Sequence, residues 1–170
     1  MAGSLVLVDS DTASNSASVS LTGISSTYDV YLCVLNGITP TADANFNMRT
    51  TTSGSADSDS EYDKASEVLK ANTSFGTTSD TDEAQWRINS TVGTDTNEEA
   101  NHTIYLFNFN NASEYSFYTN ESVKLNASGV LEGYQGGGVH TVAESNDGVN
   151  FFFTSGNIES GEFKLYGLKK

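Results

Sequence analysis

Most of this chain alternates apolar and polar residues in short segments that are separated by turn signals. Residues 44–50 place Phe46 and Met48 on one side, and residues 103–109 form a run of aliphatic and aromatic side chains. A period of two is the repeat of a β-strand, whose successive side chains point to opposite faces. About ten such segments at fairly even spacing predict an all-β, jelly-roll-like antiparallel β-sandwich.

The C-terminal segment contributes the last two predicted strands. Phe151, Phe152 and Phe153 would put rings on both faces of one strand, and a second strand begins at Gly161. At least one of the three rings then needs cover beyond a single core face. A second sheet or helix of the same chain could supply it. The alternative is a symmetric homo-oligomer, most simply a trimer, with these three rings at its interface.

One segment carries a different period. Tyr62, Ala65 and Leu69 follow helical spacing behind Ser60, so a short helix over 61–70 is predicted, the only one in the chain. Residues 51–63 and 77–83 are rich in Ser, Thr, Gly and Asp and are expected to be exposed loops. The length of 170 residues suits a single sandwich domain over 1–170.

The chain is strongly acidic, with a formal net charge of -14. Phosphates would repel such a surface and only eight basic residues could neutralise them, so nucleic acid is not an expected partner. No segment approaches the roughly 20 apolar residues of a membrane helix, so no membrane partner is expected. The acidity indicates either solubility in salt-rich surroundings or clusters that bind cations.

Two acidic clusters are candidates for Ca²⁺, which takes six to eight oxygen ligands. Asp57, Asp59, Glu61 and Asp63 alternate along one segment, and Asp9 and Asp11 form a smaller pair. The pattern of an EF-hand fails, because Tyr62 stands where its glycine belongs. Each cluster is therefore either a weak metal site or a solvated loop.

Catalytic chemistry is hard to build from this chain. His102 and His140 are the only histidines and are expected to be exposed, and no nucleophile-elbow or phosphate-binding motif occurs. Cys33, the single cysteine, lies in an apolar run and is expected to be a buried, inert thiol. The sequence predicts a protein that is not an enzyme and needs no cofactor.

A carbohydrate-binding face is an alternative function. Exposed aromatic rings on a β-sandwich can stack on sugars, while neighbouring amides and carboxylates bond the hydroxyls. The candidates are Trp86, Tyr115, Tyr118 and Tyr134. The competing interpretation is that these rings fill the core or an oligomer interface.

Several segments resemble small β-rich virion structural proteins of tailed, marine bacteriophages. They are 28–31, 36–43, 49–54, 105–109 and the ending 156–169. The resemblance implies a virion component, and it implies no catalytic residues. The expected role is decoration of the capsid exterior as an oligomer bound to the major capsid protein. The alternative is a tail-fibre tip or another receptor-binding module that recognises a host glycan.

The expected location follows from the same resemblance and from the first ten residues. They lack a basic region followed by a long apolar stretch, which favours synthesis and folding in the host cytoplasm. A fibre needs a stalk, whereas the strand pattern here begins at Leu5. Capsid decoration is therefore preferred over a fibre.

Overall fold

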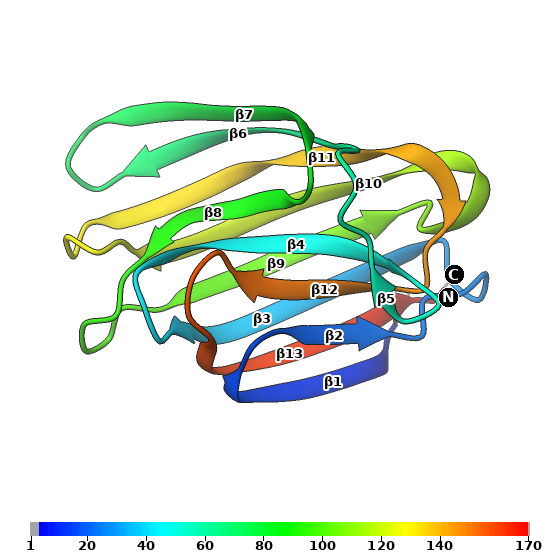
Figure 1. Ribbon diagram of the computed structural model, residues 1–170, viewed down its shortest axis with the longest axis horizontal. Coiled ribbons are helices and arrows are strands. Elements are labelled where there is room, and N and C mark those ends of the chain that lie inside the picture. The colour runs from blue at the N-terminus through cyan, green and yellow to red at the C-terminus, as the bar shows by residue number, and fades with distance from the viewer. Residues whose placement is uncertain (1–3, 170) are drawn as a thin grey trace.

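The computed structural model describes residues 4–169, and within that range it contains thirteen strands and no helix (Figure 1). The strands are β1 (Leu5–Ser16), β2 (Val19–Thr22), β3 (Val30–Pro40), β4 (Ala44–Thr52), β5 (Ser55–Ala56), β6 (Tyr62–Lys70), β7 (Phe75–Glu83), β8 (Trp86–Val92), β9 (Ala100–Phe107), β10 (Asn110–Leu125), β11 (Leu131–Ser145), β12 (Gly148–Phe153) and β13 (Ile158–Leu168). The predicted all-β architecture is confirmed.

The strands form two packed antiparallel sheets (Figure 1). The larger sheet has the order β1-β13-β3-β9-β10-β11-β6-β7, and the smaller one has the order β2-β12-β4-β5, with β8 also paired to β4. Four strands of the larger sheet, β1-β13-β3-β9, face β2-β12-β4-β8. The chain passes between these two sets as a jelly roll does, and β6, β7, β10 and β11 widen the larger sheet.

The hydrophobic core lies between the sheets as one cluster of buried side chains. Phe46 of β4 packs against Phe151 and Phe153 of β12, with ring centroids 6.0 and 4.9 Å apart. Further along, the ring of Trp86 on β8 lies 4.8 Å from both Tyr62 and Tyr118 of the larger sheet. The two pairs made by Trp86 join the sheets and help to hold the layers in register.

The predicted helix over 61–70 is wrong, because this segment is strand β6. It pairs with β11 on one side and β7 on the other. Tyr62 and Val68 are buried with strand periodicity, whereas Ala65 and Leu69 face outward. Two rows of ladder hydrogen bonds and the burial of Tyr62 override a weak local helical pattern. The acidic loop expected at 77–83 is likewise part of β7.

Candidate functional site

The outer face of the larger sheet, turned away from the smaller sheet, carries a row of outward-facing side chains. Its members lie opposite one another on successive strands. From β1 to β6 they are Leu7, Tyr166, Leu32, Tyr105, Thr119, Gly137 and Ala65. The first four members are bulky and the last three are small; of the bulky ones, Leu7 and Tyr105 are exposed, whereas Leu32 is buried among its neighbours. A row of large apolar side chains on an outward sheet face is typical of a contact surface.

Three adjoining hollows follow β10 on this face, and the first of them is lined by the three small members of the row. The first, of about 460 Å³, has Phe107 and Phe117 in its lining, and it shares Thr119 with the second, of about 370 Å³. The third, of about 350 Å³, shares Thr103 and Glu121 with the second. We call this continuous depression the outer trough. It follows β10 from residue 117 to 123, which is about 20 Å at roughly 3.4 Å per residue.

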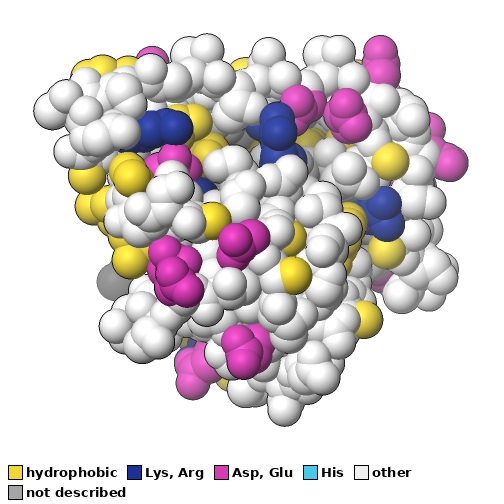
Figure 2. Space-filling view, turned by 60° about the vertical axis from the view of Figure 1, so that its left-hand side comes forward, with side chains coloured by type: hydrophobic (Ala, Val, Ile, Leu, Met, Phe, Trp, Pro, Cys, Tyr) yellow, Lys and Arg dark blue, Asp and Glu magenta, His cyan; other side chains and the backbone are white. Residues whose placement is uncertain are grey.

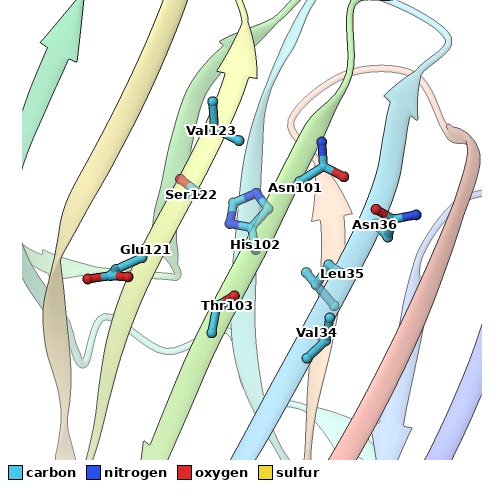
Figure 3. A pocket seen from close by; sticks show the side chains of 9 residues that line it. All are labelled: Val34, Leu35, Asn36, Asn101, His102, Thr103, Glu121, Ser122 and Val123. Carbon is cyan, nitrogen blue, oxygen red and sulfur yellow. The ribbon is translucent and has the colours of Figure 1, made fainter.

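Figure 3 shows the nine side chains that line the third hollow, and they come from β3, β9 and β10. Val34 and Asn36 of β3 form one side, and Glu121 and Val123 of β10 form the other. This end of the outer trough is polar, with amide, hydroxyl and carboxylate groups within reach. The opposite end is aromatic.

Exposed rings line the aromatic end of the outer trough. Tyr105 is 39% exposed and Phe117 is 44% exposed, and Tyr105 stacks near Phe107 with ring centroids 6.5 Å apart. Gly137, which has no side chain, lies beside them at the bottom of the outer trough. A Cβ at Gly137 would lie 2.4 Å from the carbonyl oxygen of Tyr118, so the close approach of β11 to β10 requires glycine here.

A buried polar network on the inner side of the sheet stiffens the strands under the outer trough. The ring of His102 bonds Asn89 through Nε2, at 3.1 Å, and Asn120 through Nδ1, at 3.0 Å, and the hydroxyl of Ser122 donates to the Asn89 side chain. Burial lowers the pKa of His102 to about 4, although the bond to Asn120 opposes this shift. The ring is therefore neutral at physiological pH, and the network assigns the proton to Nδ1.

Three of the four predicted sugar-stacking residues are inside the molecule. Trp86, Tyr118 and Tyr134 are buried, and the indole of Trp86 donates to the carbonyl oxygens of Asp63 and Val139. Their rings cannot stack on a ligand, so the core interpretation of these three residues is the one that fits. Tyr115 alone is exposed, at 46%, and it does not line the outer trough.

The residues that do line the aromatic end were not selected from the sequence. The run over 103–109 predicts a strong strand but not which way Tyr105 and Phe107 face, and no motif marks Phe117. Strand alternation could have identified them, because Tyr118 and Asn120 face the core and Phe117 and Thr119 must therefore face outward. A bulge in β10 beside Tyr115 interrupts the alternation, so the sequence alone does not predict which side chains of this strand face outward.

The predicted acidic cluster does not converge as a unit. The side chain of Asp59 is exposed, and Asp63 is turned toward β7, where its carboxylate accepts the backbone N–H of Asp82. Asp57 and Glu61 instead both approach Nε2 of His140, which is buried rather than exposed. His102 is also buried, so the prediction of two exposed histidines is wrong.

The smaller acidic pair caps nearby backbone. Asp9 accepts the N–H of Thr22 at 2.7 Å, and Asp11 accepts that of Thr12 at 2.7 Å. These bonds satisfy local backbone groups, as the carboxylates of solvated strands and loops commonly do.

The phenylalanines of β12 find their cover within the chain. Phe151 and Phe153 are buried in the core between the sheets. Phe152 points the other way and carries the guanidinium of Arg49, 4.6 Å from its ring centroid. The argument that these rings require an oligomer interface therefore fails, because the second sheet and Arg49 supply the cover.

One face of the molecule carries mostly acidic charges. Figure 2 shows acidic side chains scattered over one face with a few Lys and Arg between them, while hydrophobic side chains gather along its left margin. No helix of residues 4–169 is long and apolar enough to cross a membrane.

Comparison with protein-family models, curated proteins and solved structures found no match.

Proposed function

We propose that this chain is a non-enzymatic structural protein of a phage virion, which decorates the capsid exterior through the outer face of its larger sheet. The exposed members of the row, Leu7 and Tyr105 with the partly exposed Tyr166, carry the proposal, because a soluble protein seldom leaves such a patch without a partner. Two further arguments support it: the resemblance of the sequence to virion proteins, and a jelly-roll topology, which viral capsid proteins and lectins often use.

The proposed partner of this face is the major capsid protein. Leu5 and Leu168 lie opposite each other beside the row and extend its apolar surface to the edge strand β1. The outer face offers rigid, pre-formed contacts, because β13, β3 and β9 beneath it are central strands whose inner faces are buried. Such a surface loses little conformational freedom on binding.

A reconstitution experiment tests this proposal. Purified protein is mixed with particles of the encoding phage that lack it, and co-sedimentation is measured. Tyr105→Ser with Phe117→Ser should reduce binding at least tenfold, whereas Tyr115→Ser, a change at an equally exposed ring outside the outer trough, should not. Failure of the wild-type chain to bind, together with its absence from purified particles, would refute the proposal.

Self-association is a separate part of the proposal. A homo-oligomer, most simply a trimer, would use a surface that the capsid contact leaves free and not the phenylalanines of β12, which are covered within the chain. Sedimentation equilibrium at micromolar concentration checks this. If the wild-type chain shows only the 18.1 kDa species, assembly occurs on the capsid or not at all.

The outer trough favours a second function, the binding of a host glycan. Its aromatic end can stack on sugar rings, and its polar end offers Asn36, Thr103, Glu121 and Gln135 to hydroxyl groups. A glycan array, followed by calorimetry, would show binding that Tyr105→Ala weakens at least tenfold and Tyr115→Ala leaves unchanged. Equal binding by both variants would place any glycan elsewhere.

A further inference from the structure

His140 lies in a cage of three carboxylates between the sheets. Its side chain has no exposed surface. Nε2 is 3.1 Å from Oδ2 of Asp57 and 3.3 Å from Oε2 of Glu61, while Nδ1 is 3.9 Å from Oε1 of Glu144. Asp57, His140 and Glu144 each place a potential ligand atom within 4.8 Å of the other two.

The cage joins parts of the chain that are distant in sequence. Asp57 and Glu61 flank the loop that crosses from β5 of the smaller sheet to β6 of the larger one, and His140 and Glu144 lie on β11. The backbone fixes the loop, because Thr141 donates its N–H to the carbonyl oxygen of Glu61 at 2.8 Å. The N–H of Asp59 donates to the carboxylate of Asp57 at 2.9 Å, which orients that carboxylate.

Hydrogen bonds within the chain do not satisfy this arrangement. A neutral imidazole has one N–H, yet two carboxylates approach Nε2. Among the described residues, Nδ1 of His140 is buried without a hydrogen-bond partner, although it is aimed at Glu144. A positive charge placed among these groups would relieve both conflicts.

We propose that Asp57, Glu61 and Nε2 of His140 bind a divalent transition metal, with Zn²⁺ as the preferred ion. Tetrahedral ligands about 2.0 Å from a zinc ion lie about 3.3 Å from one another, which matches the two measured separations from Nε2. A nitrogen ligand favours zinc over Ca²⁺, which prefers oxygen alone. Water would complete the coordination.

Glu144 has a different role in this site. A metal on Nε2 forces the imidazole proton onto Nδ1, the atom that otherwise has no partner. Glu144 is then the acceptor of that proton, since a histidine that binds zinc commonly donates its other N–H to a carboxylate. The hydroxyl of Thr52 donates a hydrogen bond to Glu144 at 3.2 Å and so holds this carboxylate beside His140. The ion would fasten the crossover loop to β11 and so tie the two sheets together.

Isothermal titration of the chelator-treated protein with Zn²⁺ tests the proposal. We expect one Zn²⁺ per chain and a rise in the thermal midpoint, which EDTA should reverse. Asp57→Asn and Glu61→Gln, changes on the loop, should each weaken Zn²⁺ binding at least tenfold. Glu144→Gln should weaken it about 10- to 100-fold, as loss of a second-shell partner does. Asp59→Asn is the matched control and should bind as the wild type does.

Two results would overturn the site. In the first, the wild-type chain binds no Zn²⁺ at micromolar concentration. In the second, Asp57→Asn and Asp59→Asn bind it equally, which would mean diffuse attraction to an acidic surface. The spectrum of the Co²⁺ form gives an independent readout, because tetrahedral coordination with a nitrogen ligand absorbs strongly in the visible range. That band should disappear in Asp57→Asn, whose fold circular dichroism can check.

Discussion

The buried carboxylate of Glu132 offers the sharpest test of what holds the larger sheet together. It accepts Lys124 Nζ at 2.8 Å, Lys70 Nζ at 3.0 Å and the amide of Asn126 at 2.9 Å. The side chain of Lys124 has no exposed surface, and its ammonium also donates to the carbonyl oxygen of Thr91. Removing the carboxylate charge would leave the Lys124 ammonium buried without its counter-ion.

Glu132→Gln should lower the free energy of unfolding by about 3 kcal/mol, the lower end of the range for breaking a buried pair, because the amide oxygen still accepts one bond. With a denaturant slope of about 2 kcal/mol per molar urea, the unfolding midpoint falls by about 1.5 M. Lys70→Met is the matched control. Lys70 bonds the same carboxylate but is 35% exposed, so its loss should cost much less.

A midpoint change below about 0.5 M in Glu132→Gln would refute this reasoning, since it would mean that the buried ammonium needs no counter-ion. The double variant Lys124→Met with Glu132→Leu separates the alternatives. Replacing both charges by apolar groups removes the desolvation cost as well as the attraction, so this variant should recover much of the stability. A double variant as unstable as Glu132→Gln would point instead to lost packing.

The same carboxylate makes stability depend on acid pH. Burial alone would raise the pKa of Glu132, but the hydrogen bonds from Lys124, Lys70 and Asn126 outweigh burial and lower it to about 2. In the folded state the group therefore binds its proton less readily than in the unfolded state. Its contribution is fully present above about pH 5 and is lost as the pH falls toward 2. Urea midpoints measured across this window should fall steeply for the wild type and less steeply for Glu132→Gln.

Three further predictions concern single buried positions. Gly138→Ala should destabilise the fold by about 1–3 kcal/mol in a urea titration, because its Cβ would lie 2.5 Å from the carbonyl oxygen of Asp63 and 2.8 Å from Nε1 of Trp86. The control Gly76→Ala, whose Cβ would have no contact closer than 3.8 Å, should be nearly neutral in the same titration. In NMR, the ring protons of His102 should not titrate between pH 8 and 5, since its pKa is about 4; a midpoint near 6.5 would contradict the buried network. Because the folded-state pKa is lowered, His102 favours the folded state fully above about pH 6.5 and less as the pH falls toward 4. Burial raises the pKa of the Cys33 thiol, so Ellman's reagent should react with it only after denaturant is added.

The sequence predicted the sandwich because the period of two was locally visible in its best strands. Phe46 and Met48 share the buried face of β4 as their alternation required, and the apolar run containing Cys33 is a central strand of the larger sheet. The errors have one physical source. Where few side chains are apolar, as at 77–83, or where glycines cluster, as at 136–138, hydrogen bonds to neighbouring strands decide the structure.

The chemistry was harder to predict than the fold, because it depends on which face each strand turns outward. The tract Gly136–Gly138 has the composition of a flexible turn, yet it lies within β11 and pairs on both sides with β10 and β6. Gly138, the last residue of this tract, lies two residues before His140, so strand alternation puts both residues on the inner face of β11, where the histidine is buried. Without that phase, nothing in the sequence links His140 to Asp57, which is 83 residues away.

The two proposed sites share one architectural cause. Strands β10, β11, β6 and β7 widen the larger sheet beyond the four strands that the jelly-roll core supplies. Their outer face creates the trough beside Phe117. Their inner face is covered by strand β8 of the smaller sheet, through Trp86, and by the crossover loop of Asp57 and Glu61. A loop has few apolar side chains with which to hold such a position. A metal bound between the loop and β11 would fasten the loop to the sheet. It would also make β11 more rigid beneath the outer trough, so the metal site would support ligand binding in the trough without contacting that ligand.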